Sequence, residues 1–228
     1  MSTPAYTPPL GFAALTPVYD AMIGLMTRES AWRSRLVDHI GAQTDEMILD
    51  VGSGTGSVAV AVTAATPDCD FLGIDPDEPA VEIARRKTAR AGSTATFRVG
   101  IFGAPPDDHK QVADKIICSL VLHQVPLDEK RRLLRAMFER LKPGGKLFIA
   151  DYGLQRTLAM RLAFRATVQL LDGVRDTQPN ADGVLPALIE DAGFVRLRVL
   201  DDFATATGRI EILRAEKSAE VCRDMGRA

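Results

Sequence analysis

The sequence of 228 residues predicts an α/β fold: a doubly wound, seven-stranded sheet, mostly parallel with an antiparallel last strand, helices on both faces and an N-terminal helical extension. Three observations predict it. Short apolar runs alternate with helical patterns between residues 47 and 150. Residues 115–122 are nearly all apolar, as expected of a central parallel strand. The last two apolar runs are only ten residues apart, so they are expected to pair antiparallel.

The segment before the sheet is predicted to be an extended arm followed by helices. Three of the first ten residues are prolines, which disfavour regular structure. Apolar residues then recur at spacings of three and four over residues 18–26 and again over residues 32–40. Gly41 is expected to stop the second of these helices.

The remaining elements follow in order along the chain. Strands are predicted at residues 47–51, 71–75, 95–99, 115–122, 146–150, 195–199 and 210–214. Helices are predicted at residues 58–65, 78–91, 128–141, 157–171 and 183–192. Asp128 is expected to cap its helix, the Pro-Gly-Gly at residues 143–145 to end it, and Gly193 to close the last helix.

The length and the absence of repeats or linkers predict one domain over residues 1–228. Within it, residues 1–45 are expected to form an arm and helices that act as a lid. Residues 46–216 are expected to form the core, and residues 217–228 a tail. We expect the ligand site to lie between this lid and the core.

Composition limits the partners and the compartment. A net charge of -2 provides no general basic field for nucleic acid, so a small-molecule substrate is favoured. The three cysteines are far apart and form no ligand pattern with the three histidines, which predicts free thiols and no metal. The start of the chain lacks a secretory signal and no run is typical of an integral membrane segment. We therefore expect a cytoplasmic monomer or homodimer.

A glycine-rich loop follows the first strand. Gly52, Gly54 and Gly56 lie where a backbone can approach a ligand closely. The next helix begins there, and its free N–H groups suit a carboxylate or a phosphate. A dinucleotide fingerprint needs its third glycine at position 57, which is Ser57. The spacing therefore disfavours a nicotinamide dehydrogenase.

Two carboxylates accompany this loop. Asp50 directly precedes it, where it would repel a pyrophosphate but can orient a cationic sulfonium amino acid. Asp75 ends the second strand, 19 residues after Gly56, where a carboxylate can accept both ribose hydroxyls of an adenosine ligand. The alternative for Asp75 is a helix N-cap. Together the loop and the two carboxylates favour a sulfonium nucleoside.

Residues 49–56 (Leu-Asp-Val-Gly-Ser-Gly-Thr-Gly) and 141–147 (Leu-Lys-Pro-Gly-Gly-Lys-Leu) resemble the class I S-adenosylmethionine-dependent methyltransferases. Residues 17–20 (Pro-Val-Tyr-Asp) and 122–126 (Leu-His-Gln-Val-Pro) are similar to the branch of ubiquinone/menaquinone-type (UbiE-like) enzymes. The resemblance extends over residues 17–216 and implies a Rossmann-like fold. It also implies S-adenosylmethionine as cofactor and S-adenosylhomocysteine as product.

The resemblance implies a set of cofactor contacts. The methionine part would lie over the glycine loop and the ribose on Asp75, while backbone groups near Ile101 would contact the adenine, since Ile101 replaces the acidic residue common in the family. The implied cofactor-binding residues are Tyr19, Asp50, Gly52, Ser53, Gly54, Gly56, Asp75, Pro76, Ile101, Phe102 and Ser119.

Methyl transfer from a sulfonium is an in-line displacement, so alignment and exclusion of water matter most and a base is optional. His123, just beyond the fourth strand, is the candidate catalytic base, with a structural histidine as the alternative. Tyr6, Tyr152 and Asp151 are candidate substrate contacts. Each tyrosine is alternatively a buried aromatic, and Asp151 alternatively a turn cap.

The predicted function is methyl transfer to a small-molecule acceptor that is phenol- or quinol-like, an amine or a thiol. The main alternative is an S-adenosylmethionine-binding protein or partner subunit without transfer activity of its own. In the predicted helix over residues 157–171, Arg161 and Arg165 lie one turn apart. These arginines suit an anionic substrate if they face the cleft, and otherwise form a solvated helix face.

Overall fold

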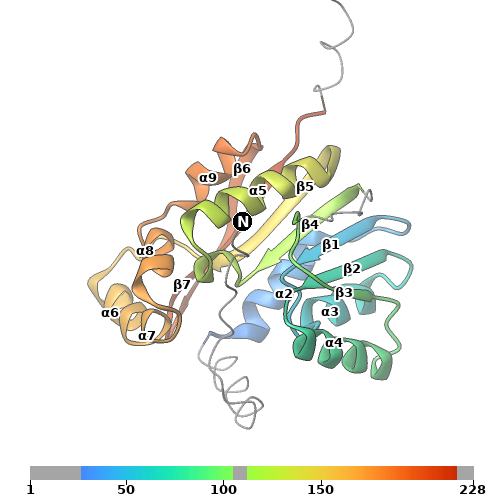
Figure 1. Cartoon of the computed structure of the whole chain (residues 1–228), viewed down its shortest axis with the longest axis horizontal. Helices are drawn as coiled ribbons and strands as arrows, with labels where there is room; N and C mark the ends of the chain where they lie inside the picture. The colour runs from blue at the N-terminus through green and yellow to red at the C-terminus, as the bar shows by residue number, and fades with distance from the viewer. Residues whose placement is uncertain (1–26, 105–111, 220–228) are drawn as a thin grey trace, which may run out of the picture.

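The computed structural model describes residues 27–104 and 112–219, which contain one seven-stranded sheet with the order β3-β2-β1-β4-β5-β7-β6 (Figure 1). Strands β1 to β5 are parallel to one another, whereas β7 is antiparallel to both β5 and β6. The predicted sheet is thereby confirmed. The strands are β1 Met47–Val51, β2 Asp70–Asp75, β3 Thr96–Val99, β4 Ala113–Ser119, β5 Leu141–Tyr152, β6 Val195–Thr205 and β7 Gly208–Glu216.

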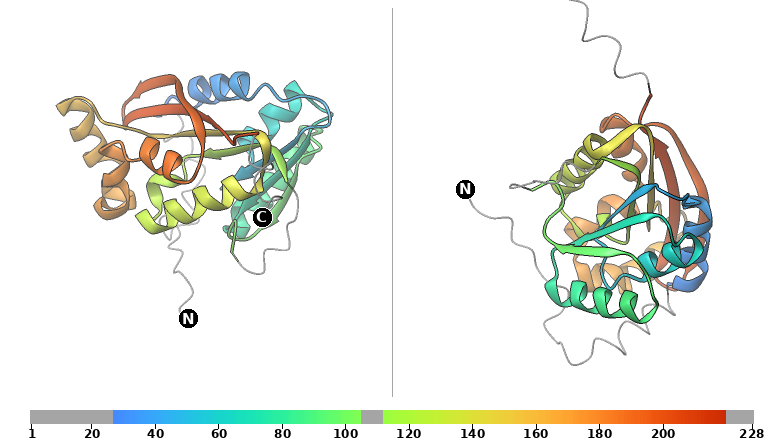
Figure 2. Two further views of the ribbon diagram at one scale, coloured as in Figure 1. Left: turned by 90° about the horizontal axis from the view of Figure 1, so that it is seen from above. Right: turned by 90° about the vertical axis from the view of Figure 1, so that its right-hand side faces the viewer.

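Helices cover both faces of this sheet (Figures 1 and 2). One buried apolar cluster joins the sheet to α2, α3 and α4, and a second joins it to α5 and α9. The predicted helix over residues 18–26 lies outside the described residues. The described helices are α2 Glu29–Ile40, α3 Ser57–Ala65, α4 Glu78–Arg90, the 3-10 helix η1 Leu122–Gln124, α5 Leu127–Arg140, α6 Leu158–Ala166, α7 Val168–Asp172, α8 Val174–Ala181 and α9 Leu185–Asp191.

Strand β1 has β2 on one side and β4 on the other, so the order of the strands reverses between β1 and β4. In β4, the side chains of Ile116, Ile117 and Cys118 are fully buried, as a central parallel strand requires. A reversal of this kind leaves a crevice at the carboxyl ends of the strands. The fold therefore places a ligand site beyond the ends of β1 and β4.

The predicted end of the fourth strand is wrong. Strand β4 stops at Ser119, and the next residue, Leu120, leaves the extended conformation with a positive φ of 54°. The apolar residues that follow were expected to continue the strand, but Leu122–Gln124 forms η1 instead. His123 consequently lies on a short helical turn at the carboxyl edge rather than in a loop.

The predicted helix over residues 157–171 is also wrong as one element. Thr167 breaks it, with φ -119° and ψ -79°, and its hydroxyl donates to the carbonyl of Ala163 at 2.7 Å. The competing side-chain bond is typical of threonine in helices. Helices α6 and α7 result, and α8 follows without having been predicted.

Three helix boundaries differ from the prediction. Helix α5 begins at Leu127 after Pro126, so Asp128 lies in the first turn and is not the cap. It ends at Arg140, before the Pro-Gly-Gly segment, which belongs to β5. The last predicted helix is the shorter α9, from Leu185 to Asp191. None of these shifts moves a predicted site residue.

Candidate active site

The carboxyl edge of the sheet brings together most of the segments predicted to bind a cofactor and an acceptor. The glycine loop follows β1, Asp75 ends β2, and η1 follows β4. Asp151 lies near the end of β5, next to β4 in the sheet. Parallel strands end at one edge, so residues far apart in the sequence meet there (Figure 1).

The glycine loop has the backbone that only glycine adopts readily. Gly54 has φ 50° and Gly56 has φ 74°. A Cβ on Gly56 would lie 2.9 Å from the Cβ of Ala84, so α4 packs directly against the loop. A Cβ on Gly54 would have no atom within 4 Å, which leaves that face of the loop open. A ligand can therefore approach the backbone at Gly54.

Asp75 is tied to this loop. Its Oδ2 accepts the N–H of Gly54 at 2.8 Å and its Oδ1 accepts the N–H of Asp77 at 2.9 Å. Burial raises the pKa of Asp75, while the two backbone bonds oppose that shift. An ionised carboxylate has about four acceptor positions, so two remain for other donors. The alternative that Asp75 is a helix N-cap is wrong, because Asp77 is the N-cap residue of α4.

Asp50 is buried without any hydrogen-bond partner among the described residues. Its side chain is 1% exposed, and neither carboxylate oxygen has a partner; nor does the buried hydroxyl of Ser53. Burial and then Asp75 raise the pKa of Asp50 to about 7, although Arg33 lowers it. An unpaired buried carboxylate is costly. A cationic ligand would remove that cost, and the residues present therefore fit the amino-acid end of S-adenosylmethionine.

His123 is held between two carboxylates. Its Nδ1 lies 2.7 Å from Oδ1 of Asp151, and its Nε2 lies 3.6 Å from Oδ2 of Asp172 in α7. Burial alone would lower the pKa of His123, but Asp151 and then Asp172 outweigh it and raise the pKa to about 9. Asp151 is fully buried and also accepts the N–H of Leu122 at 2.7 Å. At neutral pH the ring is therefore an imidazolium.

Sequence reasoning missed two charged residues here, Lys130 and Asp172. The ammonium of Lys130 donates to the carbonyls of Leu122, Val125 and Asp176 at 2.5, 2.6 and 2.7 Å. Burial lowers the pKa of Lys130 to about 8. Lys130 therefore fastens η1 to α8. No local sequence pattern reveals this role. Lys130 belongs to a strongly charged helix, whose lysines and arginines are expected from the sequence to be exposed to solvent.

The predicted adenine contacts lie in the turn after β3. Ile101 is partly exposed, whereas the ring of Phe102 is buried in the cluster beneath α5. Only the backbone of Phe102 therefore remains available to contact an adenine ring. Pro76 is half-buried after β2, and Ser119 is half-buried at the end of β4.

Of the three tyrosines predicted to contact a ligand, only Tyr152 lies within the described residues. Tyr152 is buried, its hydroxyl lies 2.7 Å from that of Thr207, and its ring packs edge-on against His123 with centroids 5.0 Å apart. It thus positions His123 from the core side. Tyr6 and Tyr19 lie outside the described residues.

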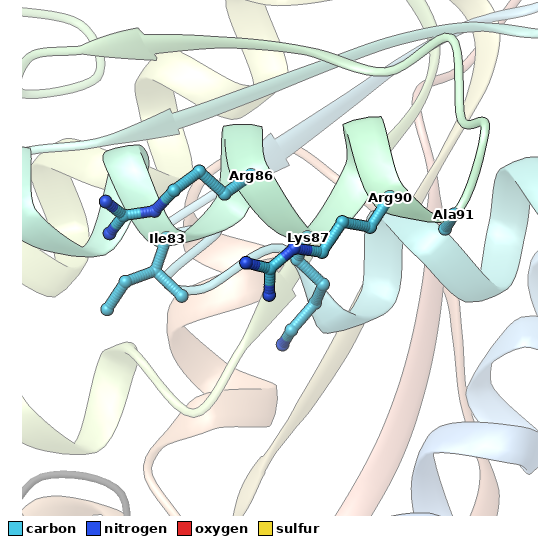
Figure 3. Close-up of a pocket in the computed structure, with 5 residues that line it drawn as sticks. All are labelled: Ile83, Arg86, Lys87, Arg90 and Ala91. Atoms are coloured by element: carbon cyan, nitrogen blue, oxygen red, sulfur yellow. The ribbon is translucent and has the colours of Figure 1, made fainter.

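A separate hollow of about 530 Å³ lies on α4 (Figure 3). Lys87 connects it to the glycine loop, because its ammonium donates to the hydroxyls of Thr55 at 3.2 Å and Ser57 at 2.7 Å. None of the predicted site residues lines this hollow. Its lining residues are Ile83, Arg86, Lys87, Arg90 and Ala91.

Three further observations concern the described residues alone. They contain no group of three or more His, Cys, Asp or Glu side chains that could hold a metal ion, and the expectation of no metal stays a prediction. Cys69 and Cys118 are buried free thiols. Within residues 27–104 and 112–219, no helix is both long and apolar enough to cross a bilayer.

The sequence is similar to curated methyltransferases. A family profile for a methyltransferase domain matches residues 49–147. The ubiquinone/menaquinone biosynthesis C-methyltransferase UbiE of Geotalea daltonii is 29% identical over 151 residues, which cover 64% of this chain and 63% of that protein. The chain therefore matches less than two thirds of that relative. The demethylmenaquinone methyltransferase of Thermus thermophilus is 26% identical over 186 residues, covering 78% of this chain and 83% of the relative.

Solved methyltransferase structures share the fold. An O-methyltransferase family protein from Burkholderia thailandensis superposes with a TM-score of 0.67 at 20% identity, covering 91% of this chain and 62% of that one. The magnesium protoporphyrin IX methyltransferase of Synechocystis, with bound S-adenosylhomocysteine, superposes with a TM-score of 0.63 at 19% identity, covering 92% of this chain and 90% of that one. At such identities the likeness concerns the fold alone.

Proposed function

Because the chain belongs to the class I S-adenosylmethionine-dependent methyltransferases of the UbiE-like kind, we propose that it transfers a methyl group from S-adenosylmethionine to a small-molecule acceptor. The observation that carries the proposal is the unpaired carboxylate of Asp50 beside an open glycine loop. A buried anion of this kind needs a cation, and a sulfonium amino acid brings one. The cofactor supplies an electrophilic methyl group when bound.

The residues of the chain bind and orient in this proposal. Asp50 pairs with the ammonium end of the cofactor, and the backbone at Gly54 lies along its methionine part. Asp75 accepts the ribose hydroxyls with the lone pairs that Gly54 and Asp77 leave unused. The backbone near Ile101 and Phe102 contacts the base. Alignment of the acceptor with the methyl group then provides most of the catalysis.

His123 is proposed as the base for an acceptor that must lose a proton. Asp151 orients its ring through Nδ1, and Nε2, which lies 3.6 Å from Oδ2 of Asp172, is proposed as the atom that exchanges the proton. With a pKa of about 9, the ring must first lose its own proton. We therefore expect a rate that rises with pH toward about 9 for a phenol- or quinol-like acceptor. An amine or a thiol that ionises in solution needs no such step.

The proposal is tested on Asp75. Asp75→Ala should weaken S-adenosylmethionine binding about 10- to 100-fold, since a hydrogen bond to a charged group is worth about 1.5–3 kcal/mol. Calorimetric titration measures this. Asp77→Ala is the matched control, because it removes a carboxylate two residues away that does not bond to the glycine loop. Unchanged affinity in Asp75→Ala would refute the assignment of the ribose to this residue.

A cofactor-binding protein without transfer activity is the second candidate, since in-line transfer requires no diagnostic nucleophile. Release of S-adenosylhomocysteine in a panel of phenol, quinol, amine and thiol acceptors separates the two. Release with any acceptor eliminates the second candidate. Binding of the cofactor with no release by any acceptor class would favour it.

The organisation around the active site is part of the same proposal. We infer one domain over residues 1–228, with residues 1–45 as a lid, residues 46–216 as the Rossmann-like core and residues 217–228 as a tail. The protein is proposed to be a cytoplasmic monomer or homodimer with no nucleic-acid partner. Sedimentation of the purified chain measures its oligomeric state.

A further inference from the structure

The segment between β5 and α9 projects from the rest of the molecule. Helices α6, α7 and α8 lie together at the end of the molecule far from α4 (Figures 1 and 2). We call residues 154–176, from the end of β5 into α8, the insert. The insert touches the active site through Asp172, whose carboxylate faces His123.

The insert exposes an unusual amount of apolar surface. Of the eleven large apolar residues that the described part of the chain exposes, five lie between residues 158 and 174. Leu158 is 74% exposed and Leu170 is 77% exposed. Exposed apolar residues gathered on one segment indicate an interaction surface, whereas exposed leucines scattered over a protein do not. The five residues are Leu158, Leu162, Leu170, Leu171 and Val174.

Arginines are interleaved with these leucines. On α6, Leu158, Arg161, Leu162 and Arg165 follow one another at positions i, i+3, i+4 and i+7, so all four share one helix face. The opposite side of α6 carries Phe164, which is buried. The exposed arginines of the insert are Arg156, Arg161, Arg165 and Arg175. Arg156 lies 4.0 Å from the carboxylate of Asp202, and Arg161 donates to the carbonyl of Gln155 at 3.0 Å, so the argument rests on Arg165 and Arg175.

The acidic residues of the insert do not cancel this charge. Asp172 is directed at His123, with 3.6 Å between its Oδ2 and Nε2. Asp176 is half-buried, and the ammonium of Lys130 donates to its backbone carbonyl at 2.7 Å and attracts its carboxylate. The outward surface of the insert is therefore apolar and basic at once.

We propose that the insert docks on a lipid surface that carries anionic headgroups. The leucines enter the boundary between headgroups and acyl chains, and the arginines extend to the phosphates. Each basic side chain near such a surface adds attraction that salt weakens. A second copy of this chain is a poorer occupant, because a two-fold contact through this face would bring arginines against arginines.

The α4 surface provides the contrast that makes the proposal testable. Arg86 and Arg90 lie about one turn apart there and line a hollow with one isoleucine and one alanine (Figure 3). That surface is basic but has no comparable set of exposed leucines. A purely electrostatic attraction to anionic lipid would use both surfaces, whereas docking through the insert would use one.

The experiment is cosedimentation of the full chain with vesicles of phosphatidylcholine alone or mixed with phosphatidylglycerol. Wild type should bind the mixed vesicles only. The pair Arg165→Glu and Arg175→Glu should weaken binding about tenfold or more, as should Leu158→Ser with Leu162→Ser. The matched pair Arg86→Glu and Arg90→Glu should retain wild-type binding. Circular dichroism checks that each variant is folded.

Three results would overturn the proposal. Wild type that binds mixed vesicles no better than phosphatidylcholine vesicles shows that the insert does not recognise anionic lipid. Equal losses in the α4 pair and in the insert pair show a general charge effect. A dimer in the absence of lipid that dissociates in Leu158→Ser with Leu162→Ser assigns the surface to a second copy. The measurement is independent of methyl transfer, so it fails or succeeds separately from the proposed function.

Discussion

At the β1–β2 half of the carboxyl edge, the side chains of Asp50 and Ser53 are buried without hydrogen-bond partners in residues 27–104 and 112–219. At the β4–β5 half, by contrast, His123, Asp151 and Lys130 are all paired within the protein. Both halves bury charge at the ends of parallel strands. They differ in where the compensating charge comes from. In the first half Arg33 supplies positive charge to Asp50, but burial and Asp75 outweigh it. In the second half the compensating groups come from η1, β5, α7 and α8.

Asp50 and His123 both have a raised pKa, but for different physical reasons. The pKa of Asp50 is raised because burial penalises its charge, so its anion is unstable until a cation arrives. The pKa of His123 is raised although burial opposes the shift, because two carboxylates stabilise its cation. We therefore propose that the uncompensated charge of Asp50 belongs to the half that binds the cofactor, whereas the paired charges of the other half hold it rigid. The following changes test that distinction, from the largest expected effect to the smallest.

Gly54→Ala should abolish most cofactor binding. The added methyl group would occupy the open side of the loop, and overpacking costs about 1–3 kcal/mol, or up to about 100-fold in affinity. Gly92→Ala is the matched control, since Gly92 also has a positive φ and open space around a Cβ but lies beyond α4. Calorimetry with S-adenosylmethionine and urea midpoints are measured for both. Equal affinities of wild type and Gly54→Ala for S-adenosylmethionine would show that the cofactor does not lie against Gly54.

Asp50→Asn should stabilise the protein without cofactor above about pH 7. The folded state holds the Asp50 proton up to about pH 7, whereas the unfolded state releases it near pH 4. Wild-type stability from this group is therefore lost as pH rises from about 4 to 7. We expect a gain of about 2 kcal/mol at pH 8 and none at pH 4, less than the full shift implies, because a buried charge draws in water.

The measurement for Asp50→Asn is the urea midpoint of both proteins across that pH range. The same variant should bind S-adenosylmethionine more weakly, because the ammonium loses its partner. A variant that is less stable than wild type at pH 8 would mean that Asp50 has a structural partner, and the contrast between the two halves would fail.

Asp172→Asn should lower the pKa of His123 by about one unit, or about 1.4 kcal/mol, because one of its two carboxylates becomes neutral. The raised pKa stabilises the fold fully below about pH 6.5, and this contribution is lost as pH rises toward about 9. The variant should therefore lose less stability over that range. Asp176→Asn is the control, since that residue lies near Lys130. Nuclear magnetic resonance of the imidazole protons reports the pKa, and an unchanged value would exclude Asp172 as a partner.

Much of the sheet could be predicted from the sequence, because alternation of apolar runs is a local signal. β1 was predicted at its observed bounds, and Gly41 was correctly predicted to end α2, where its φ of 48° requires glycine. The break at Thr167 could not be predicted, since the apolar pattern continues through it and only backbone geometry marks it. The end of β4 was missed for a similar reason, because Leu120 is apolar yet has a positive φ.

The sequence by itself determined the class of fold, the glycine loop and the two carboxylates beside it. These lie within 25 residues of one another, and spacing along a strand, loop and helix fixes them. Only the tertiary structure decided that Asp50 has no hydrogen-bond partner in the described part of the chain and that His123 faces two carboxylates. Partnership depends on segments as far apart as residues 123 and 172, and only their packing shows whether a buried charge is compensated.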